Sequence, residues 1–314
     1  MKRASGIPAC ALSLLIGVQC HAAAPRFEKV SDHCYFFESK GEAANAAAVV
    51  SDDGVLLVNP PGEADPSAAL EALRKLTTRP VRWIVHTDYR FKRSGGARRF
   101  VEQGALVLGS RQLDILASEA PAAPDANTAK APDSAAPTRL VFKHQMRVYP
   151  GGVEVRMIAL HTKALTGGDV IVFVPSEKVL MVGNLYVAGR FPDIDVTPGG
   201  GSVLGWLDGM KQAIDAVPLL KAAIPLKTEI KPGEEEKSLE ETVAVLPARG
   251  PKSNLQEMKD LLEAAHKLRA EIAKQVTAGR DSDTFLASPA AEPFRSFENL
   301  DGFVRQLFDA LSQK

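Results

Sequence analysis

The sequence predicts a mixed α/β fold in which helices are layered against β-sheets. Short alternating segments fill residues 27–58 and return in residues 140–182, and segments with helical spacing follow each run. The expected order is therefore sheet–helix–sheet–helix, with each half repeating the same arrangement. A chain of 314 residues with 45% hydrophobic positions supports one large domain or two small ones.

The first half is expected to begin with an antiparallel meander of about four strands over residues 27–58, where short alternating segments are separated by turns. Asp65 is placed to cap a helix that ends at Leu76, because Leu70, Leu73 and Leu76 share one face. The elements expected after it are strand 81–85, a helix that begins near Ser94, strand 105–108 and helix 111–118.

The second half follows an insertion at residues 119–138. This segment is rich in Ala, Pro, Asp, Ser and Thr and has no periodicity, which predicts a flexible, solvated loop. The clearest helix of the chain covers about residues 254–277, with Ser253 and Gln256 as a capping-box pair and Gly279 as its stop. The other elements expected are strands 140–142, 153–160, 170–174, 179–182 and 244–246, and helix 203–217.

The N-terminus has the three parts of a secretory signal peptide. A cationic head precedes an apolar run over residues 7–18, and small residues follow it. We expect cleavage after Ala22, which makes residues 1–22 the signal peptide and the mature protein periplasmic or secreted. A lipid anchor and a buried N-terminal helix are the alternatives. No later stretch approaches the roughly 20 apolar residues that span a bilayer, so we expect no membrane attachment after cleavage.

The charge balance and the cysteine content argue against a nucleic-acid partner and against an internal disulfide. Lys and Arg number 38, as do Asp and Glu, and this balance argues against a nucleic-acid partner. Cleavage would remove Cys10 and Cys20, and Cys34 alone cannot form an internal disulfide. Because Cys34 lies in an alternating segment, we interpret it as a packed strand residue.

One strand-to-helix turn carries a family motif. Residues 85–96 read Val-His-Thr-Asp-Tyr-Arg-Phe-Lys-Arg-Ser-Gly-Gly. This segment resembles the signature of the metallo-β-lactamase superfamily, in which Thr-His-x-His-x-Asp-His-x-Gly-Gly occupies such a turn. His86 precedes the motif's threonine, and we expect it to have a structural polar role.

Further landmarks resemble the family in the same order along the chain. They are His161-Thr162 with Gly168-Asp169, the strand end Gly183-Asn184-Leu185, the helix start at residues 201–207 and the turn Pro247-Ala248-Arg249-Gly250-Pro251. The resemblance covers residues 27–287 and implies the four-layer αβ/βα sandwich of that superfamily. It suggests a metallo-β-lactamase-like domain over residues 23–287 and a C-terminal helical extension over residues 288–314.

The resemblance also implies where zinc ligands would lie, and nearly all of those positions hold other residues. The four first-turn positions are Asp88, Arg90, Lys92 and Arg93. The family's bridging aspartate, its last histidine and an acidic residue after the second hairpin correspond to Asn184, Arg249 and Asn59. His161 alone matches a family ligand.

The chemistry of these residues opposes a zinc cofactor. Zinc takes lone pairs from thiolate, imidazole or carboxylate, whereas arginine carries only donors. A unit cation about 4 Å from a divalent ion repels it by roughly 8 kcal/mol at an effective dielectric constant of about 20. We therefore expect no zinc, and without zinc the hydroxide on which the family's hydrolysis rests is not generated.

Our first hypothesis is a pseudoenzyme with an anion-binding pocket at the vacated centre, because arginine matches carboxylate or phosphate bidentately. The pocket would be formed by Asp88, Arg90, Lys92, Arg93, His161, Asn184 and Arg249. In a simpler arrangement, Lys92 and Arg93 point to solvent and Arg90 pairs with Asp88.

Two alternatives remain for the function. The first is a hydrolase that holds one weakly bound metal through His161 and Asp88. The second is a protein that binds a periplasmic partner through residues 119–138 or the C-terminal helices. Outside these regions, we expect His144 and His266 to be surface or packing histidines.

Overall fold

The first of two β-sheets takes its strands in chain order. The computed structural model of the protein describes residues 26–39, 44–60, 67–93, 96–119, 138–194, 196, 200–217 and 242–313. Strands β1 to β4 pair antiparallel, which confirms the predicted meander, and β4 to β7 pair in parallel. The strands are β1 (Phe27–Lys29), β2 (Cys34–Phe37), β3 (Ala46–Ser51), β4 (Gly54–Val58), β5 (Val81–Val85), β6 (Leu106–Ser110) and β7 (Thr138–Phe142).

The second sheet has the order β13-β12-β11-β10-β9-β8, and only its β11–β12 pair is parallel. Its strands are β8 (Gln145–Val148), β9 (Val155–Ala159), β10 (Val170–Val174), β11 (Val179–Gly183), β12 (Ala244–Pro247) and β13 (Ser253–Asn254). The sequence did not predict β8. This strand is only four residues long and lies at the sheet edge, where its two apolar side chains are half-buried, so its alternation is too short to mark a strand.

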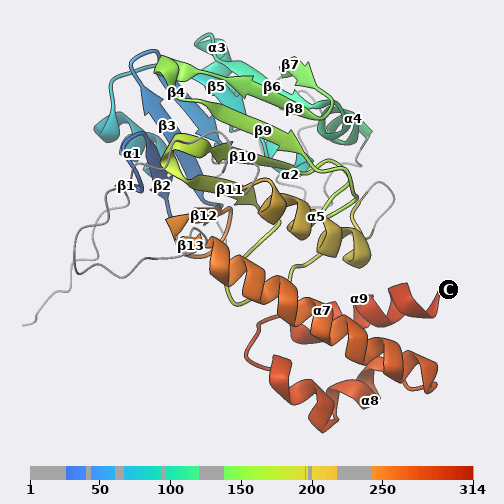
Figure 1. Cartoon of the computed structure of the whole chain (residues 1–314). Helices are drawn as coiled ribbons and strands as arrows, with labels where there is room; N and C mark the ends of the chain where they lie inside the picture. Colours follow the sequence, from blue (N-terminus) through green and yellow to red (C-terminus); the bar gives the residue numbers. More distant parts are fainter. Residues whose placement is uncertain are drawn as a thin grey trace, which may run out of the picture.

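Three hydrophobic cores define four layers, helix–sheet–sheet–helix, and confirm the predicted sandwich (Figure 1). The middle core lies between the sheets, where Val49 and Val85 face Met157 and Val172. One outer core packs α1 (Ser67–Leu76) and α3 (Arg98–Glu102) against the first sheet. The other packs α5 (Val203–Asp215), α7 (Leu255–Thr277) and α9 (Leu300–Ser312) against the second.

Helix α2 (Tyr89–Arg93) begins earlier than the expected start near Ser94. A carboxylate oxygen of Asp88 accepts a hydrogen bond from the backbone N–H of Arg90 at 2.9 Å. Asp88 is thus placed as an N-cap, and a cap of this kind fixes the first residue of a helix. Helix α4 (Arg111–Glu119) lies where the sequence predicts it.

Helix α7 begins at Leu255, but its cap is Asn254 instead of the expected Ser253. The side-chain oxygen of Asn254 accepts from the backbone N–H of Glu257 at 2.9 Å. The hydroxyl of Ser253 lies 2.7 Å from the hydroxyl of Tyr186 and is engaged there. Gly279, with a φ of 69°, follows the end of the helix as predicted.

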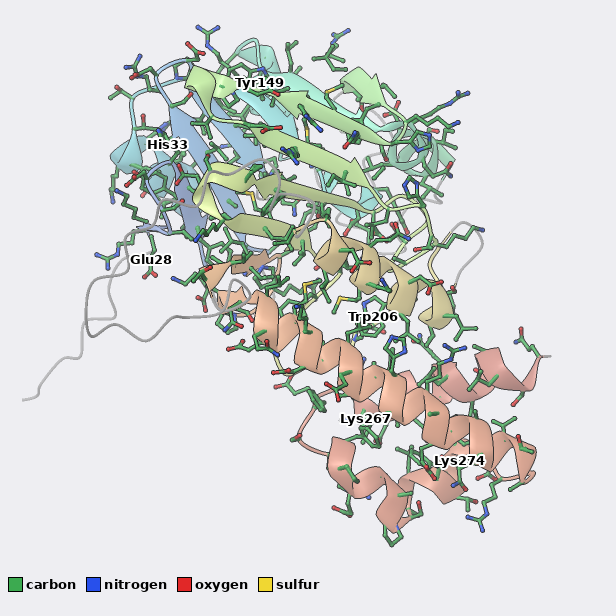
Figure 2. The ribbon with its side chains drawn as sticks, viewed as in Figure 1. Glu28, His33, Tyr149, Trp206, Lys267 and Lys274 are labelled. Atoms are coloured by element: carbon green, nitrogen blue, oxygen red, sulfur yellow. The ribbon has the colours of Figure 1, made fainter. Side chains whose placement is uncertain are left out.

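The C-terminal elements pack on α5 and α7 below the sandwich (Figure 1). They are α8 (Ser282–Leu286), a 3₁₀ segment (Pro289–Phe294) and α9. Trp206 of α5 is fully buried between these helices (Figure 2), and its indole N–H donates to the carbonyl of Leu185 at 2.8 Å. Phe285 and Phe308, on either side of residue 287, contact one another with ring centroids 6.2 Å apart. The division of the chain at residue 287 stays a prediction.

Several predicted features lie outside the described residues. They are the signal peptide at residues 1–22, the cap at Asp65, the helix start near Ser94 and nearly all of the insertion at residues 119–138. Cys34 is buried in β2, as predicted for a packed strand residue. None of the helices within the described ranges has the length and apolar character that crossing a membrane requires.

Candidate functional site

Loops from both sheets meet at one edge of the sandwich. Thr87 follows β5 in the first sheet, and its carbonyl accepts from the backbone N–H of Val170 at the start of β10. The turn after β11 and the turn after β12 are joined by a 2.7 Å bond from the N–H of Ala248 to the carbonyl of Gly183. The residues that resemble the family's ligand positions are carried by these loops.

Asn59 and Thr87 form a reciprocal pair beneath the site. The amide of Asn59 donates to the hydroxyl of Thr87 at 2.8 Å, and its oxygen accepts from the backbone N–H of Thr87 at 2.9 Å. Gly183 lies against this pair, and a Cβ there would come within 2.1 Å of the Thr87 hydroxyl. Asn59 therefore has a structural role at the position where the family has an acidic residue.

Asp88 is the most fully engaged side chain of the site, and its residue is 1% exposed. One oxygen accepts from the backbone N–H of Arg90 at 2.9 Å and from its Nε at 3.5 Å. The other accepts from the amide of Asn184 at 2.9 Å and from Nη2 of Arg90 at 3.5 Å. A carboxylate offers about four lone-pair sites, so protein donors occupy all of them.

Arg90 reaches from this buried carboxylate to solvent. Its side chain is 40% exposed, whereas that of Asp88 is 2% exposed. Desolvation lowers the pKa of Arg90, but the charges of Asp88 and Asp169 outweigh it, so the pKa lies above its usual value. Arg90 is therefore a fixed cation, with its remaining guanidinium donors available on the solvent side.

Asp169 is a second buried carboxyl, which the sequence analysis named in a landmark but did not include among the pocket residues. Its oxygens accept from the backbone N–H of Thr166 at 2.8 Å and from the Thr166 hydroxyl at 2.7 Å. Burial raises its pKa to about 7, and the charge of Asp88 adds to that shift, while the Thr166 bonds and Arg90 oppose it. The Thr-x-x-Asp spacing in a glycine-rich turn was the available signal.

The structure brings together three of the seven predicted pocket residues, namely Asp88, Arg90 and Asn184. His161 is exposed, and its ring lies against that of His144, with centroids 5.3 Å apart. Arg249 is exposed in the turn after β12. Lys92 and Arg93 belong to α2, but the directions of their side chains lie outside what the structure describes. His86 is buried beside the turn.

These residues do not fit a zinc centre. Protein donors from Arg90 and Asn184 surround the Asp88 carboxylate, and the guanidinium of Arg90 places a positive charge where a metal ion would lie. Among the described residues, no three His, Cys, Asp or Glu side chains are grouped as metal ligands. The void bounded by Asn45, Asn59 and Gly183 has a volume of about 10 Å³, close to the minimum for one water molecule.

Comparison with solved structures places this geometry in a known architecture. A metallo-β-lactamase from Pontibacter korlensis is 17% identical with a TM-score of 0.53, and the match covers 77% of this chain and 99% of that one. A metallo-β-lactamase from Hirschia baltica is 12% identical with a TM-score of 0.54, over 77% of this chain and 98% of that one.

A second kind of neighbour matches more of the chain. A stereoselective inverting sec-alkylsulfatase from Pseudomonas sp. is 13% identical with a TM-score of 0.64, over 91% of this chain and 50% of its own length. This chain thus spans half of that sulfatase. No family model and no curated protein sequence matches the chain. The layers, the sheet order and these structural neighbours together show that the chain has the metallo-β-lactamase fold.

Proposed function

We propose that this protein is an exported, non-hydrolytic metallo-β-lactamase-fold protein that binds a small anion at the vacated metal centre. The observation that carries the proposal is the environment of Asp88. Its carboxylate is saturated by Arg90 and Asn184, two residues that have replaced ligand positions of the family. The site therefore presents hydrogen-bond donors where a zinc enzyme presents lone pairs.

The anchoring of Arg90 supports anion binding. Nε and Nη2 of Arg90 donate to the two carboxylate oxygens of the buried Asp88, each at 3.5 Å, which is the long limit of a hydrogen bond. A guanidinium has five N–H donors in a planar fork, so donors remain for an oxyanion that approaches from solvent. Because Arg90 is already oriented, an incoming anion loses less side-chain entropy than it would on a free arginine.

Arg249 is the second cation that we assign to the pocket. Its turn is fixed by bonds from Ala248 to Gly183 and from the side-chain amide of Asn45 to the carbonyl of Gly250 at 2.8 Å. These bonds hold the turn beside the loop that carries Asn184. The ligand class is a carboxylate, phosphate or sulfate group, and the likeness to an alkylsulfatase makes sulfate esters part of the panel to test.

The experiment is a calorimetric titration of the mature, untagged protein with inorganic phosphate, sulfate, citrate and an alkyl sulfate. We expect one of these to bind with a stoichiometry of one, and Arg90→Ala combined with Arg249→Ala to weaken binding at least tenfold. Arg305→Ala is the matched control, because Arg305 is an exposed arginine of α9 that pairs with Asp283. Unchanged affinity in the double variant would overturn the proposal.

A hydrolase is the second candidate, because the solved neighbours are named as lactamases and a sulfatase. Turnover of a lactam, ester and alkyl sulfate panel, with and without added zinc, separates the two functions. Zinc-dependent turnover that survives in Arg90→Ala would exclude the non-hydrolytic function. We expect no turnover above buffer, with zinc or without it.

A further inference from the structure

Two imidazole rings lie side by side at an exposed end of the second sheet. His144 lies in the turn between β7 and β8, and His161 follows β9. Their ring centroids are 5.3 Å apart, with planes inclined at 57°, and both residues are exposed. The antiparallel register, with Gln145 opposite Ile158, brings the two positions to the same end of the β8–β9 pair.

The backbone of each histidine is fixed. The carbonyl of His144 accepts from the N–H of Ala159 at 2.8 Å. The N–H of His161 donates to the side-chain oxygen of Gln212 on α5 at 2.9 Å. The two rings therefore start from anchored points on neighbouring segments, and bringing them together costs little additional backbone entropy.

The separation of the rings matches that of two imidazoles bound to one metal ion. A metal–nitrogen bond of about 2.05 Å places a ring centroid roughly 3.2 Å from the metal, and a tetrahedral angle then separates two centroids by about 5.2 Å. The observed separation is 5.3 Å. The planes are inclined at 57°, an arrangement that two imidazoles on one metal ion can adopt and that aromatic pairs in general also adopt.

We infer that His144 and His161 form a solvent-facing two-histidine site for a divalent transition-metal ion. Imidazole nitrogen suits copper, nickel and zinc, and Cu²⁺ binds such ligands most tightly. Water molecules complete the coordination, since no third His, Cys, Asp or Glu groups with the pair in the described part of the chain. The site takes His161 from the pocket predicted from the sequence, but it contains none of the three residues grouped around the Asp88 carboxylate, namely Asp88, Arg90 and Asn184.

Two lysines beside the pair weaken the site without blocking it. Lys143 and Lys163 are both exposed, so their flexible stems can hold the ammonium groups in solvent. Salt screens exposed charges over about 8 Å at physiological ionic strength.

The test is a calorimetric titration of the untagged, mature protein with Cu²⁺ at pH 7.5, together with electron paramagnetic resonance of the bound ion. We expect one Cu²⁺ per chain with a signal from two nitrogen ligands. His144→Ala and His161→Ala should each lower the affinity at least tenfold, and the double variant, which has neither imidazole, should bind at least as weakly as either single variant. His266→Ala, an exposed histidine of α7, is the matched control and should bind as the parent does.

The outcomes separate this inference from the anion pocket. His144→Ala should leave anion affinity unchanged, and Arg90→Ala with Arg249→Ala should leave Cu²⁺ affinity unchanged. Copper affinity that His144→Ala and His161→Ala do not alter would overturn the inference, as would a signal from a single nitrogen.

Discussion

Asp88 and Asp169 are both buried beside Arg90, yet their surroundings differ in the number of donors. Asp88 receives hydrogen bonds from the backbone and guanidinium of Arg90 and from the amide of Asn184. Within the described part of the chain, Asp169 receives hydrogen bonds only from Thr166, and burial raises its pKa to about 7. Burial is the main cause of this raised pKa and the Thr166 donors oppose it, so the following predictions test how much the partners of each carboxyl contribute to stability.

The largest expected effect is the pH dependence that Asp169 gives to stability. Its folded pKa of about 7 lies above the ordinary value of about 3.9, so the folded state holds the proton more tightly. The stability contribution is complete below about pH 4 and is lost as the pH rises through 7, a change on the order of 4 kcal/mol. Asp169→Asn should remove this slope in urea unfolding measured from pH 4 to pH 8.

The parent and the variant must be compared at each pH, because other groups also titrate. Their difference in unfolding free energy should change steadily between pH 4 and pH 7 and stay constant above pH 8. A difference that does not vary with pH would show that the Asp169 carboxyl has an ordinary pKa in the folded protein. Asp301→Asn, on the exposed surface of α9, is the control.

The next effect concerns the cation that neutralises Asp88. Arg90→Met should lower the unfolding free energy by about 3 kcal/mol, because it leaves a buried carboxylate without its charge partner. This value sits at the low end of the usual range, since the Arg90 side chain is 40% exposed. Arg98→Met breaks an exposed helix pair with Glu102 and should cost less than about 0.5 kcal/mol. Equal losses of unfolding free energy in Arg90→Met and Arg98→Met would show that the buried Asp88 carboxylate does not depend on Arg90 as its charge partner.

A smaller effect is expected at Asn184. Asn184→Ala removes one 2.9 Å bond to the Asp88 carboxylate and should cost about 2 kcal/mol in chemical denaturation. Asn184→Asp keeps the shape but faces Asp88 with a second carboxyl, and it should cost at least as much at pH 8 and less at pH 5. If the aspartate variant is as stable as the parent at pH 8, Asn184 does not donate to Asp88.

The smallest expected effect is on the pKa of Asp169 when its hydrogen-bond partner Thr166 is replaced. Thr166→Val removes the hydroxyl bond of 2.7 Å but keeps the backbone bond of 2.8 Å. The pKa of Asp169 should rise by about one unit, equivalent to about 1.4 kcal/mol. Titration of the carboxyl carbon by nuclear magnetic resonance measures this directly. Thr166→Ser, which retains the hydroxyl, should leave the pKa where it is in the parent.

Much of the fold could be read from the sequence, because inner strands and the long helix carry local patterns. The meander over residues 27–58 and the helix that ends at Thr277 are examples. The edge strand β8 was not predicted because its alternation of exposed and half-buried side chains covers only four residues. Helix α2, which lies ahead of the helix expected near Ser94, was not predicted because its five residues are too few to show helical spacing.

The sequence predicted which residues lie at the site better than it predicted which of them contact one another. The ligand replacements follow from the motif, and the pairing of Arg90 with Asp88 was one of two arrangements considered. The coupling of Asp169 to Asp88 depends on burial and on a contact between segments far apart in the chain, which no local pattern encodes. The proximity of His144 to His161 likewise depends on the register of β8 and β9.

The double role of Asp88 has a consequence for engineering. One carboxylate both starts α2 and neutralises Arg90. Replacing Asp88 with histidine to introduce a metal ligand would remove the cap of α2 and leave the Arg90 guanidinium without its carboxylate partner. Replacing Arg90 with histidine alone would leave the carboxylate without its counter-charge. Introducing a metal site into this turn therefore requires the two replacements together, with a new cap for the helix.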